Sequence, residues 1–392
     1  MKRLNFLTLL PFVLIVFACS GEKEETKLTS SLSDQRFEFE IYDSLVVDYL
    51  GNLMLMDISS NGSNFLFIDE ASDSILVTDK AGEILYQYKK SGEGPEDYDE
   101  GRSGKAVFIS NEEFIVPTTS QLVQFNIQGE FTKRFKPEFN GFATLLVPSS
   151  KVLFKQGDYF YTKLTGRYTD LIQQGTDYQT KSTQLERVNI QTGEFEPIVS
   201  FPKGSKYKSE EIEFGALDFQ PVFTVAQDSL YVIFRNEPKI FGYSLTNLDS
   251  PVYSRSIPLP FFVERDVNKK LENGGFITRD YLLGSINSIY KIDDSAFLLS
   301  YNSGITDEQF GEVNSAAGDD FKKIFKEAAK FWRIETVVFN GNSISKGIKE
   351  PEPLGSIAKI ISKDEIWFNL DYSNVENDYS VIYKTRLVAQ KE

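Results

Sequence analysis

Two side chains that carry much enzyme chemistry, the imidazole of His and the thiol of Cys, are missing or rare in this chain of 392 residues. It has no His and one Cys, while 42 Lys and Arg stand against 57 Asp and Glu. Without imidazole, a Ser–His–Asp triad, a His-ligated zinc and an imidazole general base are excluded, and one thiol can form neither an internal disulfide nor a thiolate metal cluster. The chemistry that remains is that of oxygen ligands and of cations.

Carboxylate and amide oxygens could still hold a hard cation such as Ca²⁺. Side chains of this kind stand near the ends of predicted strands: Asn61, Asn236, Asn302 and Asp371. If they converged on a central channel, they could support a metal-dependent hydrolase or lactonase. Asn and Asp at strand ends also cap turns, so calcium is a possible cofactor and the metal ligands stay unassigned.

A second set of side chains suits binding, because planar rings and guanidinium groups recognise glycans, peptides and acidic ligands. These residues fall at strand ends and in insertions of the repeat described below: Arg102, Arg167, Tyr168, Arg235, Asn236, Tyr301, Asn302 and Tyr372. The sequence therefore predicts a binding surface at these positions and assigns no catalytic residue.

The charge of the chain bears on its partners. The formal net charge is −15, and no stripe of Lys and Arg supplies a local basic footprint. Binding to phosphate backbones requires such a footprint, so the composition excludes nucleic acid as the expected partner.

The elements that must position these residues form a repeat. Short apolar strands begin near residues 65, 113, 159, 230, 296 and 366, and most stand within a series of four strands joined by tight turns. The strands are apolar on both faces, as expected where each sheet lies between two others. The sequence predicts an all-β, six-bladed β-propeller of four-stranded antiparallel blades over residues 37–392.

The last repeat has only three obvious strands, and residues 36–47 form a strand without a partner of its own. Pairing the two would close the ring and remove both open sheet edges. We therefore expect a monomeric propeller that is closed by its N-terminal strand.

The long insertions predict where the binding surface lies. Residues 90–104, 165–182, 202–220, 259–283 and 302–331 all connect strands on the same face of a propeller, where binding surfaces are usually built. Residues 319–332 have the apolar spacing of one amphipathic helix. It could be a lid across the central opening or a docking helix for a partner, but we expect it to pack onto its own face, because so apolar a stripe rarely stays exposed.

The N-terminal sequence predicts the cellular location of the protein. Lys2 and Arg3 precede an apolar stretch at 4–17, which is too short to span a bilayer as a helix, and Cys19 follows it. The segment resembles a bacterial lipoprotein signal peptide, which implies cleavage after residue 18 and lipidation of Cys19. Residues 19–36 then form an acidic tether, similar to the export signal of surface lipoproteins of the Bacteroidota. The resemblance implies an outer-membrane lipoprotein, exposed at the cell surface and held to the membrane by its lipid alone.

One motif adds a family resemblance. The segment Ser91-Gly92-Glu93-Gly94-Pro95-Glu96-Asp97-Tyr98 resembles the Gly-x-Gly-Pro-Gly-Glu-Tyr turn of six-bladed β-propeller lipoproteins of the Bacteroidota, which are NHL-like in architecture and include the DUF4221 domains. Glu96 replaces the third Gly of that pattern and Asp97 replaces its Glu. The resemblance implies the same fold and supplies no catalytic residue.

Three functions remain open at this point. The first is a lipid-anchored envelope protein that binds a glycan, a peptide or a protein partner with its loop-rich face. The second is the calcium-dependent hydrolase or lactonase, with its site in the central channel. The third is a purely structural protein of the envelope.

Overall fold

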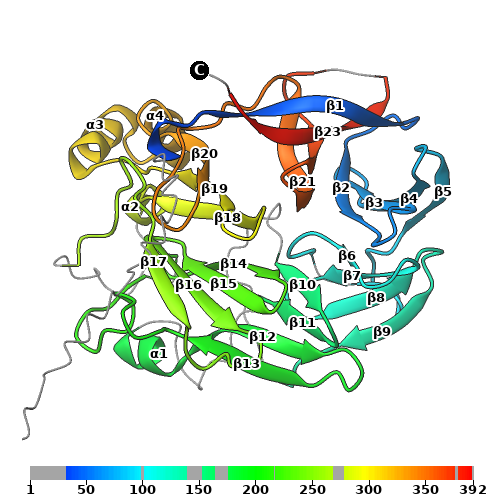
Figure 1. Cartoon of the computed structure of the whole chain (residues 1–392), viewed down its shortest axis with the longest axis horizontal. Coiled ribbons are helices and arrows are strands. Elements are labelled where there is room, and N and C mark those ends of the chain that lie inside the picture. Colours follow the sequence, from blue (N-terminus) through cyan, green and yellow to red (C-terminus); the bar gives the residue numbers. More distant parts are fainter. Residues whose placement is uncertain are drawn as a thin grey trace, which may run out of the picture. The chain divides into compact units, whose positions relative to one another are not determined.

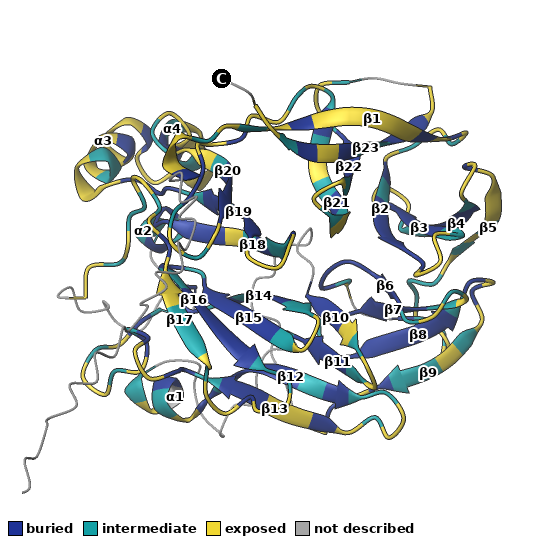
Figure 2. Ribbon diagram, viewed as in Figure 1, coloured by how far each residue is buried: buried dark blue, intermediate teal, exposed yellow. Residues whose placement is uncertain are grey.

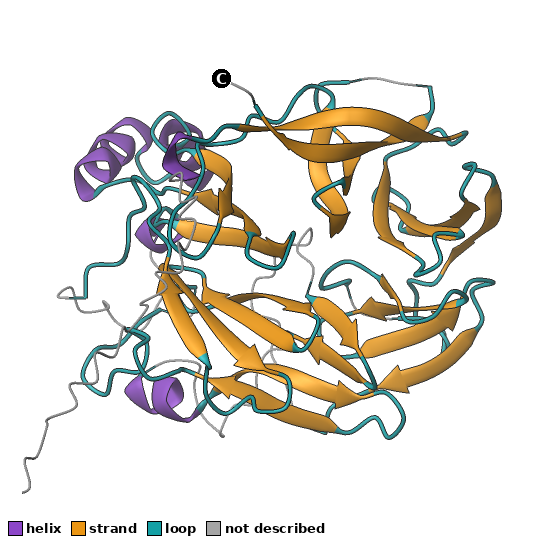
Figure 3. Cartoon of the chain, in the orientation of Figure 1, coloured by secondary structure: helices purple, strands orange, loops and turns teal. Residues whose placement is uncertain are grey.

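The computed structural model describes residues 32–98, 101–138, 152–163, 175–215, 217–267, 278–375 and 378–390, and these belong to one compact unit, Ser31–Glu392. Within this unit, six antiparallel sheets follow one another around a closed ring (Figure 1). Strands dominate and the few helices are short (Figure 3). Three residues singled out above, Cys19, Arg167 and Tyr168, lie outside the described residues. Within the described residues, no helix is both long and apolar enough to cross a bilayer.

The first three blades each have four strands. Blade 1 consists of β2 (Leu53–Ile58), β3 (Asn64–Asp69), β4 (Ser74–Asp79) and β5 (Ile84–Lys89). Blade 2 consists of β6 (Val107–Phe108), β7 (Glu113–Pro117), β8 (Leu122–Asn126) and β9 (Phe131–Phe135). Blade 3 consists of β10 (Leu153–Gln156), β11 (Tyr159–Thr162), β12 (Thr183–Asn189) and β13 (Phe195–Ser200).

The last three blades complete the ring. Blade 4 consists of β14 (Pro221–Ala226), β15 (Ser229–Phe234), β16 (Glu237–Ser244) and β17 (Tyr253–Ser256). Blade 5 consists of β18 (Ser285–Lys291), β19 (Phe297–Asn302) and β20 (Ile334–Phe339). Blade 6 consists of β21 (Leu354–Ser362), β22 (Glu365–Leu370), β23 (Ser380–Ala389) and β1 (Phe37–Val47).

The N-terminal strand closes the ring, as the sequence predicts. β1 pairs antiparallel with β23 from Phe37 opposite Ala389 to Val47 opposite Ser380, and it is the outer strand of blade 6. Phe39 is 3% exposed and packs edge-on against Phe368, with ring centroids 4.9 Å apart. The chain's first strand is thus bound both by a backbone ladder and by side-chain packing.

The apolar strands serve two interfaces at once. In β3, Leu66 and Ile68 belong to a buried cluster shared with blade 2, whereas Phe65 and Phe67 belong to a cluster shared with blade 6. Since successive strand residues point to opposite faces, a strand between two blades must be apolar at every position. Figure 2 shows the resulting continuous burial of the inner strands.

Six such clusters join the blades in order around the ring, one for each pair of neighbours. They are the clusters between blades 1 and 2, 2 and 3, 3 and 4, 4 and 5, 5 and 6, and 6 and 1. The core is therefore distributed between the sheets, and every blade depends on both of its neighbours.

Blade 5 departs from the predicted four strands, since only three regular strands are present. In the fourth position, residues 344–348 form two isolated bridges to β20. The Ser345 hydroxyl accepts the Val338 N–H at 3.0 Å, so a side chain replaces a backbone carbonyl in the ladder. Lys346 N–H turns away from β20 and donates to Gln35 O at 3.1 Å. These bonds, together with Gly347 and Pro351, prevent a regular outer strand.

The prediction of one helix over 319–332 is also corrected. The insertion contains two helices, α3 (Asp307–Ala317) and α4 (Phe321–Ala328). α3 begins at a capping box, in which Gln309 N–H donates to Thr306 Oγ1 and Thr306 N–H donates to Gln309 Oε1. α4 begins after Asp320, which accepts Lys323 N–H at 3.1 Å. The apolar faces of both helices pack onto Leu282 and Ile305, which confirms that this insertion covers its own face.

We expect the closure strand to contribute a large part of the stability of the unit. Phe39→Ala should lower the free energy of unfolding by about 3 to 5 kcal/mol, because it removes a buried ring at the contact that closes the propeller. Urea unfolding of residues 31–392 measures the change. Ile41→Ala is the matched control, since Ile41 lies on the same strand but is 37% exposed, and a cost equal to that of Phe39→Ala would contradict the assignment.

Candidate functional site

The long connections occupy one face of the ring. Because the strands of each blade alternate in direction, the connections β5–β6, β11–β12, β13–β14, β17–β18 and β19–β20 all emerge on the same side. We call this side the insertion face. Two further short helices lie in these connections, α1 (Thr176–Lys181) and α2 (Thr278–Tyr281).

A buried ionic network holds the insertions of the insertion face together. Arg265 of the β17–β18 connection forms ion pairs with Asp218 of the β13–β14 connection and with Asp280 of α2. Both carboxylates are 1% exposed, and the distance from Arg265 Nη2 to Asp280 Oδ1 is 2.5 Å. Burial raises the pKa of Asp218 in spite of its guanidinium partner. If these connections moved apart, Arg265 or the two carboxylates would stay buried without a partner, which is costly. The network therefore holds the connections in place.

The same network continues into the helical insertion. Arg279 of α2 donates to Asp307 Oδ1 at 3.1 Å and to Ile305 O at 2.8 Å. Gly304 has a φ of +71°, and a Cβ there would lie 2.3 Å from the backbone nitrogen of Gly284, so only glycine allows this approach. The insertion face is therefore built on fixed connections.

The predicted binding residue Arg102 lies beside the glycine motif. Its Nε donates to Asp73 Oδ1 at 2.9 Å, and the Tyr98 hydroxyl donates to Asp73 Oδ2 at 3.0 Å. Tyr98 is 1% exposed and belongs to the cluster between blades 1 and 2. The motif at 91–98 thus inserts Tyr98 between two blades. Arg102 positions Asp73, which accepts the hydrogen bond of the Tyr98 hydroxyl.

Four other predicted residues also have internal partners. Asn236 is buried and bridges Val263 O, Gly284 O and Arg265 N–H. The hydroxyl of Tyr301 donates to Glu335 at 2.7 Å, and Asn302 accepts Gly304 N–H at 2.9 Å. The hydroxyl of Tyr372 donates to Leu53 O at 3.1 Å, across the closure between blades 6 and 1. The described residues of the predicted set are not gathered around one point, and their role in binding stays a prediction.

Arg235 differs from these residues because its guanidinium group is poorly paired. Its one hydrogen bond is a 3.5 Å contact from Nη1 to Leu217 O. Its backbone N–H donates to Gln220 O at 2.9 Å, and the side chain of the same Gln220 accepts Lys163 Nζ at 3.1 Å. Burial, and then the charge of Arg235, lower the pKa of Lys163 to about 7. We refer to Lys163, Gln220 and Arg235 as the cation cluster.

In the central channel, the described cavity lining contains one carboxylate, Asp57, and two lysines, Lys291 and Lys359. A cavity of about 210 Å³ is lined by inner strands of the ring and includes the ion pair between Asp57 and Lys359. Asp57 Oδ2 also accepts Phe108 N–H at 2.8 Å, and Lys105 Nζ donates to Ile357 O at 2.7 Å. In the part of the chain that the structure describes, no group of three or more Asp, Glu or Cys side chains could hold a metal ion. Asn61 and Asp371 cap turns.

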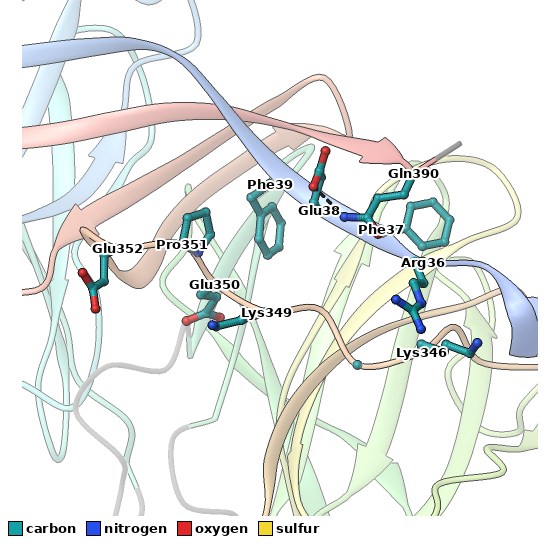
Figure 4. A pocket seen from close by; sticks show the side chains of 11 residues that line it. Arg36, Phe37, Glu38, Phe39, Lys346, Lys349, Glu350, Pro351, Glu352 and Gln390 are labelled. Carbon is teal, nitrogen blue, oxygen red and sulfur yellow. Dashed lines mark hydrogen bonds between the residues drawn. The ribbon is translucent and has the colours of Figure 1, made fainter. Parts of the chain in front are cut away.

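A larger cavity of about 850 Å³ opens between blades 5 and 6, beside the irregular fourth position of blade 5 (Figure 4). On one side, residues 36–39 line it from the start of β1. On the other side it is lined by the segment 346–352. Figure 4 shows three cations around it, Arg36, Lys346 and Lys349, which form no ion pair with any described residue. We call it the rim cleft.

A second cavity of about 470 Å³ lies behind the same segment. It shares Lys349 and Glu350 with the rim cleft, and its other polar lining comes from Asn287, Ser288, Ser300, Thr336 and Ser356. The Glu350 side chain is exposed, but nearby protein atoms exclude part of the water around its carboxyl group. This partial desolvation raises the pKa of its carboxyl, against a weak 3.4 Å bond from Thr336.

Sequence reasoning missed the rim cleft entirely. Its residues belong to a connection that is not long and to a strand that was assigned only a closing role. The available signal was local: Gly347 and Pro351 interrupt the segment where blade 5 should have its outer strand. An outer strand that cannot form leaves a gap beside the next blade.

The fold is shared with a solved structure. A member of the DUF4221 family from Bacteroides vulgatus superposes with a TM-score of 0.60 at 13% identity, over 91% of this chain and 99% of that chain. A candidate exported protein of Bacteroides fragilis has a TM-score of 0.48 at 12% identity, over 93% and 97%. BamB of Moraxella catarrhalis has a TM-score of 0.42 at 10% identity, over 89% and 99%. No protein-family model matches the sequence, and no curated protein matches it. The resemblance to DUF4221 propellers predicted from the sequence is thus confirmed for the fold.

We expect Lys163 to lower the stability of the folded state at neutral pH. In the unfolded chain it keeps its proton up to pH about 10.4, whereas in the fold it loses it near 7, so between these values the unfolded state binds more protons and stability rises with pH. Lys163→Met should raise the free energy of unfolding by about 2 kcal/mol at pH 6.5, and the gain should shrink toward pH 10.

Urea unfolding at a series of pH values measures this effect. Lys322→Met is the control, because Lys322 is exposed on α4 and its removal should change stability little at any pH. A stability difference for Lys163→Met that does not change with pH would contradict the shifted pKa.

Proposed function

We propose that this chain is an exported, lipid-anchored binding protein of the cell envelope, and that it binds an extended peptide segment of a partner protein in the rim cleft. The observation that carries the proposal is that an unpaired sheet edge lines a cavity surrounded by unpaired charges. Strand addition to such an edge is a common mode of peptide recognition, in which backbone bonds give affinity and side-chain pockets give specificity.

The backbone of β1 faces the cleft with free groups. Gln390 N–H donates to Arg36 O, so Arg36 and Glu38 direct their backbone groups toward β23. In an antiparallel pair the intervening residues direct theirs outward, and these are Phe37 and Phe39. β1 is the outer strand of its sheet, and no described strand pairs with its other edge. A partner strand could therefore continue blade 6 as a fifth strand.

Three cations and three carboxylates line the cleft, and the carboxylates are Glu38, Glu350 and Glu352. An acidic segment would therefore be favoured where it runs beside the cations. Arg36, Lys346 and Lys349 are exposed and have no carboxylate partner among the described residues, in a chain whose formal net charge is −15. Glu38, by contrast, is already bound by Gln390 Nε2 at 2.7 Å (Figure 4). Acidic side chains that alternate along an added strand would meet these cations, while the intervening apolar side chains would pack near Phe37 and Pro351.

The anchor follows from the N-terminal segment. Lipidation of Cys19, followed by an acidic tether, would hold the propeller away from the membrane, because both the body and the membrane surface are anionic. The tether predicted at 19–36 is shorter than expected, since Leu32 is already buried against the propeller. The tether ends next to β1, so the cleft would lie on the part of the propeller where the anchor begins.

Peptide binding can be measured by fluorescence polarisation on residues 31–392. We expect a labelled eight-residue peptide in which Glu and Val alternate to bind saturably, and at least tenfold more tightly than the same peptide with Lys in place of Glu. Lys346→Glu combined with Lys349→Glu should weaken binding at least tenfold, because it reverses two charges of the cleft.

The matched control is Lys322→Glu combined with Lys363→Glu, which makes the same charge change at two exposed lysines elsewhere. A version of the acidic peptide that is N-methylated at every residue lacks all of its N–H donors and should not bind. Equal binding of the N-methylated peptide would exclude strand addition, and no binding of the acidic peptide would contradict the proposed function.

Lipid anchoring predicts a change in fractionation. Cys19→Ala should abolish incorporation of labelled palmitate and release the protein from the membrane fraction of cells that process lipoproteins. Proteolysis of intact cells then tests surface exposure of the wild type. Retention of Cys19→Ala in the membrane fraction, with unchanged labelling, would show that another segment provides the anchor.

A further inference from the structure

We propose that the cation cluster of Lys163, Gln220 and Arg235 is a second binding site, separate from the rim cleft, and that it takes an oxyanion: the carboxylate or phosphate group of a small molecule. The three residues come from blades 3 and 4 and lie where the insertion connections leave the inner strands. The site does not depend on the proposed function, since it shares no residue with the rim cleft.

Gln220 brings the two cations together. It directly precedes β14, the inner strand of blade 4, and its side-chain oxygen accepts Lys163 Nζ at 3.1 Å. Its backbone oxygen accepts Arg235 N–H at 2.9 Å. Lys163 directly follows β11 and its N–H donates to Val152 O at 3.1 Å, while Arg235 directly follows β15. All three residues are thus positioned by strand ends of two adjacent blades.

The cluster has more positive charge than its neighbours compensate. Asp218 is the carboxylate whose charge acts on Arg235. Both oxygens of Asp218 already accept bonds from Arg265, and one also accepts Gly215 N–H. Lys163 has no acidic partner among the described residues. Two half-buried cations without a counter-ion of their own are costly, and a bound anion would remove that cost.

The cluster also presents a free donor. Among the described residues, Gln220 Nε2 is buried without a hydrogen-bond partner, and the five N–H groups of the Arg235 guanidinium make one long bond. Donors of this kind are normally satisfied in folded proteins. An oxyanion next to Lys163 Nζ could accept from the ammonium, the amide and the guanidinium fork at once, which is the arrangement that recognises carboxylates and phosphates.

Burial and the charge of Arg235 both disfavour the ammonium form of Lys163 and lower its pKa, and a bound anion would act in the opposite direction. All three side chains are only partly buried, so an ion could reach them from solvent. Carboxylate and phosphate share the chemistry that the cluster offers, and the measurement below separates them.

Isothermal titration calorimetry on residues 31–392 tests the site with inorganic phosphate and, in a separate arm, with acetate, each against NaCl of equal ionic strength. We expect saturable one-to-one binding of at least one of the two anions, and the one that binds more tightly identifies the group. Lys163→Met and Gln220→Met should each weaken that binding at least tenfold.

Two controls make the outcome specific. Lys322→Met removes an exposed lysine and should bind as the wild type does, and so should the rim-cleft variant Lys346→Glu with Lys349→Glu. Because Lys163→Met removes a partly buried charge without a counter-ion and is expected to stabilise the fold, loss of binding in this variant cannot come from unfolding. Absence of binding by both anions, or equal affinity in Lys163→Met and wild type, would overturn the proposal.

Discussion

The pairing of β1 with β23 is the contact on which the rest of this structure depends. A propeller blade buries both faces against its neighbours, so an open ring would expose two apolar sheet faces as well as two strand edges. Here the closure joins residue 37 to residue 389, nearly the whole length of the chain, and Phe39 seals it against Phe368. Every other blade interface is held in place by that one long-range contact, because the blades support one another in series.

The closed ring holds the ends of the insertions in fixed positions. Charged groups in the insertions can therefore be buried with their partners in place, which offsets the cost of desolvation. Arg265, Asp218 and Asp280 come from two connections, one on each side of blade 4. Their ionic network is favourable only if its geometry is fixed. The same rigidity positions the cation cluster, whose residues follow or precede strands of two adjacent blades. Rigid strand ends can hold like charges close together that flexible loops would separate.

The fold could be predicted from the sequence because its main signal is local and repeated. Strands that are apolar at every position, as in residues 65–68, can only lie between two other layers, and the unpaired strand at 36–47 matches the missing strand of the last repeat. The capping box at Thr306 was equally local but lies before a helix of weak apolar periodicity, so α3 was missed. In α4 the stronger periodicity indicated the correct element, although the helix ends at Ala328.

The candidate sites could be predicted only in part, since they arise where a polar or charged side chain has no partner within the protein. Arg102, Asn236 and Tyr301 have types that suit binding, yet each has an internal partner from a distant part of the chain. Arg235 also lies at a strand end, but Asp218, the carboxylate among the described residues whose charge acts on it, is already bound to Arg265. Whether a cation is neutralised depends on three-dimensional neighbours, and no spacing in the sequence records them. Likewise, the rim cleft exists because Ser345 replaces a backbone acceptor in blade 5, a substitution of one hydrogen bond that leaves the free edge of the closing strand beside an open cavity.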